Sequence, residues 1–189
     1  MIVVLLGPPG AGKGTQANIL CESKELFHFS TGDILRHEVK KKSAIGKKIE
    51  SIINGGKLVG DEIIIQIVEK ILSEELLKSK GILFDGFPRN LDQAHAFAEL
   101  LKKQNKKIDC VLHILIDKEE IIKRIQKRQT EEDREDDSID VLKSRIDVYL
   151  KETTPLIDLY KKKNVLKTLN GMQSIANVSN DIFKSMEEI

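Results

Sequence analysis

Residues 7–15, with the sequence GPPGAGKGT, combine residue types and spacing that indicate chemistry on phosphates. They match the phosphate-binding pattern Gly-x-x-x-x-Gly-Lys-[Ser/Thr] as far as Lys13. Gly14 then stands where the pattern has a hydroxyl that holds magnesium, and Thr15 follows one residue late. Glycines let backbone N–H groups surround phosphate oxygens, and a lysine adds positive charge. The segment predicts a nucleotide phosphate site; the alternative is a glycine turn that only joins a strand to a helix.

Residues 85–89, DGFPR, form a second candidate motif. Asp85 ends an apolar run, which is the usual place for a carboxylate that holds magnesium or its water shell. The planar guanidinium of Arg89 suits a phosphate group. The alternative is a solvent-facing turn that caps a helix.

The arginines form a third candidate set, because the chain uses Lys at most other basic positions. Arg124 and Arg128 are one helical turn apart and share a helix face. Phosphoryl transfer depends on positioning and on charge stabilisation, so a clamp of arginines is what that reaction requires. Surface ion pairs with nearby aspartates are the alternative. The set comprises Arg36, Arg89, Arg124, Arg128, Arg134 and Arg145.

Predicted strands and helices alternate along the chain, and these elements must position the candidate residues. Strands are predicted at 2–6, 27–30, 81–85, 110–117 and 165–169. Helices are predicted at 13–23, 33–42, 44–54, 61–77, 91–104, 118–128, 138–162 and 173–186. This order favours one α/β domain over residues 1–189, with a doubly wound, five-stranded parallel sheet that binds ligands at the carboxyl ends of its strands. Residues 30–60, which are helical, and 129–137, which lack a helix or strand signal, are expected to be insertions over that edge.

Composition narrows the class of protein. The chain has 189 residues, 40% of them apolar, and its net charge of +1 gives no support for nucleic acid or a membrane as a partner. The apolar run at 2–6 is too short to cross a bilayer. Cys21 and Cys110 are far apart, which favours reduced, buried thiols over a disulfide or a zinc site. We therefore expect a soluble, cytoplasmic protein, and a monomer.

Six motifs together resemble those of nucleoside monophosphate kinases, and most closely those of the adenylate kinase family. The resemblance extends from Ile2 to about Gly171. Its motifs read GPPGAGKGTQ, FSTGDILR, GKLVGDE, DGFPRNLDQA, RIQKR and REDD…SRIDVY. The family's loop is Gly-x-Pro-Gly-x-Gly-Lys-Gly-Thr, so Gly14 is expected there. The resemblance implies a P-loop kinase with a nucleoside-monophosphate-binding insertion at 30–60 and a short lid at 129–137. It also implies the reaction ATP + AMP ⇌ 2 ADP, with Mg²⁺ bound to ATP.

The resemblance also implies roles for individual residues. The expected ATP-binding residues are Gly10, Ala11, Gly12, Lys13, Gly14, Thr15, Arg124, Arg128 and Gln173. The expected AMP-binding residues are Thr31, Arg36, Lys57, Leu58, Val59, Gly86, Phe87, Pro88, Arg89, Gln93, Arg134 and Arg145. The expected catalytic residues are Lys13, Asp85, Arg89, Arg128, Arg134 and Arg145, with Asp85 holding magnesium through water. No structural zinc is expected, because the short lid lacks the four cysteines of long-lid relatives.

The nucleotide that accepts the phosphate is the finer question. By resemblance, Thr31 and Gln93 favour AMP, because kinases of UMP and CMP tend to have Ala and Asn at these places. Other classes remain possible. A GTPase would need Asn-Lys-x-Asp, which the chain lacks. A non-catalytic nucleotide-binding protein would not need the arginines, and a small-metabolite kinase would not keep Thr31 and Gln93.

Overall fold

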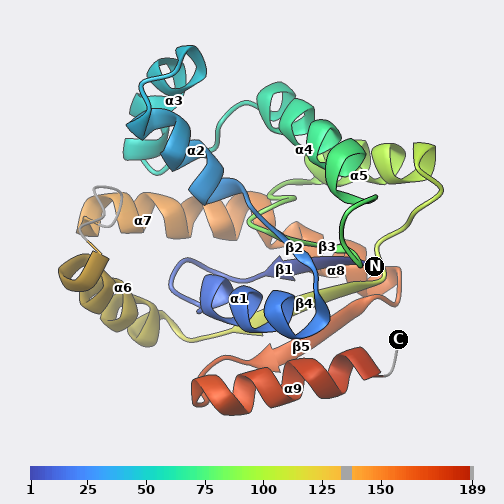
Figure 1. Cartoon of the computed structure of the whole chain (residues 1–189). Coiled ribbons are helices and arrows are strands. Elements are labelled where there is room, and N and C mark those ends of the chain that lie inside the picture. Colours follow the sequence, from blue (N-terminus) through green and yellow to red (C-terminus); the bar gives the residue numbers. More distant parts are fainter. Residues whose placement is uncertain (133–137, 188–189) are drawn as a thin grey trace.

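A five-stranded parallel sheet forms the centre of the molecule. The computed structural model describes residues 1–132 and 138–187. The strands lie in the order β2-β3-β1-β4-β5, and each neighbouring pair is parallel. The sequence prediction of a doubly wound α/β fold is confirmed (Figure 1). The strands are β1 Ile2–Leu6, β2 Phe27–Ser30, β3 Ile82–Asp85, β4 Cys110–Leu115 and β5 Leu166–Asn170.

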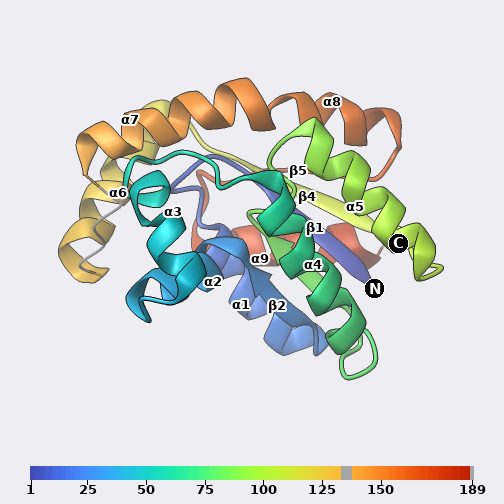
Figure 2. The same ribbon diagram turned by 90° about the horizontal axis from the view of Figure 1, so that it is seen from above.

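Helices cover both faces of this sheet (Figure 2). Short polar residues start several of them: Ser30, Ser43, Asn90 and Ser138 each accept a hydrogen bond from a backbone N–H in the first turn. The helices are α1 Lys13–Lys24, α2 Thr31–Lys40, α3 Ala44–Asn54, α4 Asp61–Glu75, α5 Leu91–Lys103, α6 Lys118–Glu132, α7 Ile139–Val148, α8 Pro155–Lys162 and α9 Ile175–Glu187, with a π-helical turn, η2, at Tyr149–Thr153.

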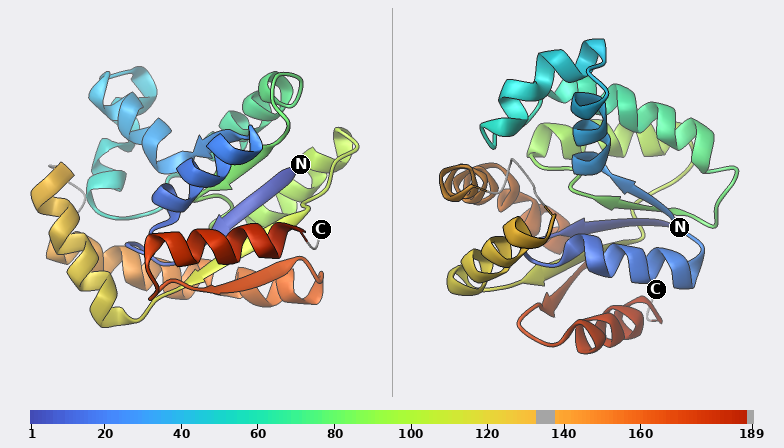
Figure 3. Two further views of the ribbon diagram at one scale, coloured as in Figure 1. Left: turned by 60° about the horizontal axis from the view of Figure 1, so that its bottom comes forward. Right: turned by 60° about the vertical axis from the view of Figure 1, so that its left-hand side comes forward.

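Alternate side chains of β1 enter two separate cores. Val4 packs with side chains of α4, α5 and α8, whereas Val3 packs with α1 and α9. Figures 2 and 3 show these two pairs, α5 with α8 and α1 with α9, on opposite sides of the sheet. Every residue of β1 is buried, so a continuous run of β-branched and leucine residues is what a strand at this position needs. Cys21 and Cys110 are both free and buried, as the sequence predicted.

The helical segment 31–60 contains α2 and α3 with no strand between them, which confirms the expectation from the sequence. Figure 1 shows this pair extending away from the sheet, on the side where the strands end. The two helices pack against each other, and their remaining surface at the carboxyl edge of the sheet is available to a ligand.

Two sequence predictions about helices are wrong. Residues 129–132 are helical, because α6 continues without a break to Glu132, whereas no helix was expected there. Residues 133–137 of the predicted lid lie outside the described part of the chain.

The second wrong prediction is a single helix over 138–162. Three segments occupy that stretch: α7, the π-helical η2 and α8. Pro155 has no backbone N–H and cannot continue an α-helical hydrogen-bond ladder. The ladder instead widens just before it, where the Thr154 N–H bonds the Tyr149 carbonyl five residues back.

Within residues 1–132 and 138–187, none of the helices has the length and apolar character that crossing a membrane requires.

Candidate active site

The carboxyl ends of three neighbouring strands bring the first candidate residues together. In the sheet register, Leu5 of β1 lies opposite Asp85 of β3, and Leu6 lies opposite His113 of β4. The glycine loop that follows β1 is therefore flanked by a carboxylate on one side and an imidazole on the other. This is the edge at which parallel α/β sheets bind ligands.

The glycine loop leads directly into the start of α1. Gly12 is the N-cap of this helix and has φ 85°, a left-handed conformation that favours glycine. The Lys13 ammonium donates hydrogen bonds to the Gly7 and Pro8 carbonyls, at 2.9 and 3.0 Å. The charge is thus held inside the loop, next to the positive end of the helix. The N-terminus of α1 and the Lys13 ammonium beside it therefore suit an anion.

Asp85 lies beside this loop and is largely buried. Its Oδ2 is 3.8 Å from Nε2 of His28, and a Cβ built at Gly14 would lie 3.9 Å from the same oxygen. Within the described residues, no cluster of three or more His, Cys, Asp or Glu is arranged to hold a metal. One carboxylate beside a phosphate loop fits a Mg²⁺ ion that keeps its water shell and takes its other ligands from phosphates.

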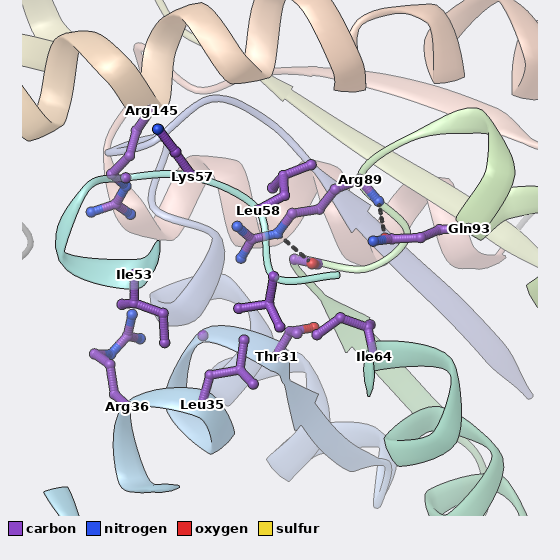
Figure 4. Close-up of a pocket in the computed structure, with 14 residues that line it drawn as sticks. Thr31, Leu35, Arg36, Ile53, Lys57, Leu58, Ile64, Arg89, Gln93 and Arg145 are labelled. Carbon is purple, nitrogen blue, oxygen red and sulfur yellow. Dashed lines mark hydrogen bonds between the residues drawn. The ribbon is translucent and has the colours of Figure 1, made fainter. Parts of the chain in front are cut away.

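A pocket opens between the α2–α3 pair and the sheet edge. It is lined by side chains from α2, the α3–α4 loop, the β3–α5 loop and α7, which converge on one cavity in Figure 4. Nine of the predicted AMP-binding residues line it: Thr31, Arg36, Lys57, Leu58, Val59, Gly86, Arg89, Gln93 and Arg145. The pocket has an apolar floor and three guanidinium groups, so it can take a flat apolar group that carries an anion.

Arg89 and Gln93 hold each other in this pocket, as the dashed line in Figure 4 shows. The Gln93 side-chain oxygen accepts the Arg89 backbone N–H at 2.8 Å, and its amide nitrogen donates to Asp61 at 2.7 Å. Arg89 Nε donates to the Gly86 carbonyl at 2.7 Å. The Gln93 amide, in a side chain only 2% exposed, therefore has a fixed orientation with one N–H left for a ligand.

A second cavity adjoins the first and contains the glycine loop. Its lining includes Lys13, Tyr149 and Thr153, together with Arg89 and Arg145, which also line the first pocket. The two arginines thus stand where the two cavities meet. Positive charge reaches this junction from the glycine loop on one side and from the β3–α5 loop and α7 on the other.

A buried hydrogen bond lies behind the second cavity. His113 Nε2 and the Tyr149 hydroxyl are 3.0 Å apart, and His113 is only 2% exposed. Burial, and then the positive charge of Lys13, hold the pKa of His113 below its ordinary value. Burial raises the pKa of Tyr149 to about 12. Both groups are therefore neutral at physiological pH.

On the far side of the glycine loop, Arg124 connects three elements. It pairs with Glu120 at 2.7 Å and donates to the Gly171 carbonyl at 2.8 Å. A Cβ at Gly12 would lie 3.8 Å from its guanidinium. Arg124 thus lies close to the glycine loop, as expected for a residue near the donor nucleotide. The Gln173 amide nitrogen donates to Asp181 at 2.8 Å and to the Asn170 carbonyl at 3.3 Å.

Some predicted residues are placed differently or not at all. Phe87 is fully buried, packs against Phe84 and Phe97, and lines neither cavity. Pro88 lines the second cavity and not the first. Arg134 and the Arg128 side chain lie outside the described part of the chain.

The sequence-based predictions missed several residues that line the first pocket, the one between the α2–α3 pair and the sheet edge. Apolar residues such as Leu35, Ile53 and Ile64 follow ordinary helical periodicity and carry no functional signal. Asp61, which holds the Gln93 amide, has the pattern of a residue in the first turn of a helix. Gly32 and Gly56 also line the pocket, and only their spacing in the sequence could have indicated them. The missed lining residues are Gly32, Leu35, Ile53, Gly56 and Ile64.

Comparison with known proteins decides the family. The family model described as adenylate kinase matches residues 5–165. The chain belongs to the adenylate kinase family. It is therefore a phosphotransferase of the nucleoside monophosphate kinase type, and a kinase of UMP or CMP is not favoured.

Relatives in this family match nearly the whole chain. An adenylate kinase of Prochlorococcus marinus is 46% identical over 184 residues, with 97% of each chain covered. One from Chloroherpeton thalassium is 39% identical over 209 aligned positions, with 96% of each chain covered. One from Maricaulis maris is 39% identical over 188 residues, with both chains covered completely.

Proposed function

We propose that this chain transfers the terminal phosphoryl group of ATP to AMP, reversibly, and gives two molecules of ADP. The observation that carries the proposal is the pair of adjoining cavities that share Arg89 and Arg145. One cavity contains the glycine loop and Lys13, and the other contains the expected AMP-binding residues. Two phosphates bound on either side of this junction would meet between two guanidinium groups.

The chemistry follows from positioning and charge. ATP would place its outer phosphates on the N–H groups of residues 10–15 and on Lys13, with its base near Arg124 and the backbone of Gln173. AMP would place its phosphate on Arg36, Arg89 and Arg145. An AMP phosphate oxygen attacks the γ-phosphorus in line, and the bond from that phosphorus to the β-phosphate oxygen breaks. The attacking oxygen is already anionic, so no protein group needs to accept a proton.

Magnesium bound with ATP would neutralise charge on the transferring phosphates. Asp85 would hold its water shell from the end of β3. No protein atom is proposed as a direct ligand, and no zinc is proposed. Gly14 suits this arrangement, because a hydroxyl at that position would compete for the metal.

The AMP base is assigned to the part of the pocket between Thr31 and Gln93. The Thr31 hydroxyl bonds the Asp85 carbonyl at 3.4 Å, and Gln93 keeps one N–H available beside it. A ring nitrogen of adenine could accept the remaining Gln93 N–H, and the adenine amino group could donate to the second lone pair of the Gln93 oxygen. AMP is therefore the proposed acceptor, ahead of UMP or CMP.

Two insertions are proposed to cover the single domain of residues 1–189 during the reaction. Residues 30–60 would close over AMP, and residues 129–137, with Arg128 and Arg134, would close over the phosphates. Exclusion of water would prevent hydrolysis of the transferring group. We also propose a cytoplasmic monomer whose ligands are nucleotides rather than nucleic acid or membrane, since the net charge is only +1.

A coupled assay tests this function. The purified chain is supplied with ATP and Mg²⁺ and, in turn, AMP, CMP, UMP or GMP, and ADP formation is followed. Rapid turnover with AMP, and little with the others, is the expected result. Preference for UMP or CMP would overturn the acceptor assignment, and no transfer to any of them would overturn the function.

A further inference from the structure

Thr153, which the sequence did not single out, makes a buried contact with the main chain of Arg89. Its hydroxyl donates a hydrogen bond of 2.7 Å to the Arg89 carbonyl, and the two residues are 64 positions apart in the chain. Thr153 is only 7% exposed. Burying a hydroxyl group costs free energy unless the group is hydrogen-bonded. The Thr153 side chain is therefore held in the orientation that points its hydroxyl at the Arg89 carbonyl.

The π-helical turn η2 is what turns Thr153 toward Arg89. The Thr154 N–H reaches the Tyr149 carbonyl five residues back, and Pro155 follows directly. This wider turn places Tyr149 and Thr153 together on the lining of the cavity that holds Lys13. Tyr149 bonds His113 behind the glycine loop, and Thr153 bonds Arg89 on the acceptor side. One turn of helix therefore contacts both halves of the site.

Two further hydrogen bonds of Arg89 stay within its own segment of the chain. Its backbone N–H bonds Gln93, and its Nε bonds the Gly86 carbonyl; these partners are only four and three residues away. These local contacts fix the shape of the loop that carries Arg89, and the sheet register places the start of this loop, at Asp85, beside Leu5. The bond from Thr153 adds a contact from a distant part of the chain, because it ties the loop to η2, which lines the same cavity.

We propose that Thr153 is a positioning residue for phosphoryl transfer, whose hydroxyl fixes the Arg89 main chain so that the guanidinium stands at the junction of the two cavities. This inference rests on the proposed function, in which Arg89 binds the acceptor phosphate. In this proposal Thr153 acts through the Arg89 main chain and is not a nucleotide-binding group. A small displacement of a phosphate-binding group is sufficient to lower the rate of a transfer that depends on alignment.

Substitutions at two adjacent threonines test the proposal. Thr153→Val keeps the size of the side chain and removes the hydroxyl, and Thr153→Ser keeps the hydroxyl. Thr154→Val is the matched control, because the Thr154 hydroxyl bonds the Tyr149 carbonyl at 3.2 Å and this carbonyl also accepts the Thr154 N–H. We expect Thr153→Val to lower kcat/KM for AMP about 10-fold. The KM for ATP should stay unchanged, and Thr153→Ser and Thr154→Val should stay within about twofold of the natural chain.

A binding cycle shows whether Thr153 acts through Arg89. The Kd for AMP is measured by calorimetry for Thr153→Val, Arg89→Ala and the double variant. Thr153→Val should raise the Kd about fivefold alone and less than about twofold when Arg89 is already alanine. Equal effects in both backgrounds would overturn the proposal, as would a normal kcat/KM for Thr153→Val or an equal loss in Thr154→Val.

Folding is checked by the Tm of every variant. If Thr153→Val does not fold, Thr153→Ala replaces it; failure of both would show that the hydroxyl is needed for folding, and the proposal would be rejected. Failure of the proposed function has a different signature, because the natural chain would then form no ADP from ATP and AMP.

Discussion

The Ser144 hydroxyl donates a hydrogen bond of 3.0 Å to the Gly55 carbonyl and so joins α7 to the loop after α3. These residues are 89 positions apart. Gly56, the next residue, lies against Val141 and Arg145 of the same helix. The segment 30–60 therefore contacts α7 beside the first pocket, which is the proposed AMP site.

Removal of the Ser144 hydroxyl should weaken this contact between α7 and the loop after α3. We expect Ser144→Ala to raise the KM for AMP about twofold, because a partly exposed neutral hydrogen bond contributes about 1 kcal/mol or less. The kcat should not fall, since Ser144 touches no reacting group. Ser185→Ala is the control, because that hydroxyl bonds a carbonyl within α9, away from the site. An unchanged KM for AMP in Ser144→Ala would contradict the role of this contact.

Two glycines near the pocket should respond differently to alanine. Gly56 has φ +69°, and a Cβ there would lie 2.9 Å from the Val141 carbonyl and 3.0 Å from Arg145 Cγ. Gly56→Ala should therefore displace the loop from Arg145 and raise the KM for AMP about 10-fold or more. A Cβ at Gly60 would meet nothing within 4 Å, and its φ of −53° suits any residue.

Gly60→Ala is thus the control for Gly56→Ala. It should leave activity unchanged and raise stability by about 0.5 kcal/mol, because alanine restricts the unfolded chain. Kinetics with AMP and thermal unfolding of both variants give the comparison. Equal behaviour of the two variants would show that the contact between Gly56 and α7 has no influence on AMP binding.

Gly14 tests the view that no protein hydroxyl binds the magnesium ion. A Cβ at this position would make only an ordinary contact, 3.9 Å from Asp85 Oδ2, so Gly14→Ser should fold normally. It should not raise kcat at any Mg²⁺ concentration. A clear gain in kcat, measured in a Mg²⁺ titration, would argue that the metal lacks a ligand that the serine supplies.

His113 should make stability depend on pH. Its pKa in the folded chain is held below the ordinary value of 6.5, so the unfolded chain binds more protons in the range below 6.5. The contribution of neutral His113 to the free energy of unfolding should therefore be complete above pH 6.5, and the free energy of unfolding should decrease as the pH falls below 6.5. Glutamine cannot titrate, so His113→Gln should reduce this slope.

Thermal unfolding between pH 8 and pH 5 measures the effect. His95→Gln, at an exposed position on α5, gives a comparison for the effect of the substitution itself. An identical slope for His113→Gln and the natural chain would show that protonation of His113 is not linked to folding.

The elements that position the glycine loop could be predicted because their signals are local. The unbroken apolar run of β1, the glycines after it and the start of α1 at Lys13 all agree with the structure. The strand that ends at Asp85 was predicted for the same reason. Residues with distinctive chemistry at strand ends therefore point to the site from the sequence alone.

The contacts that support the site could not be predicted in this way. The pairs Thr153–Arg89 and Gln93–Asp61 join segments far apart in the sequence. Thr153 and Asp61, the supporting member of each pair, carry no functional signal in the sequence. The π-helical turn was missed because an amphipathic pattern runs across it, although Pro155 marks its end. Such features depend on how helices pack against the sheet, and a periodicity of 3.6 residues contains no information about that.

The most direct test of the central claim starts from ADP alone. The natural chain is mixed with ADP and Mg²⁺, and the nucleotides are followed by ³¹P NMR. ADP should be converted to ATP and AMP in equal amounts without release of inorganic phosphate, because the proposed function has the two nucleotides meet at the cavity lined by Lys13, Arg89 and Arg145. ADP that stays unchanged, or that decays to AMP and inorganic phosphate, would contradict this claim.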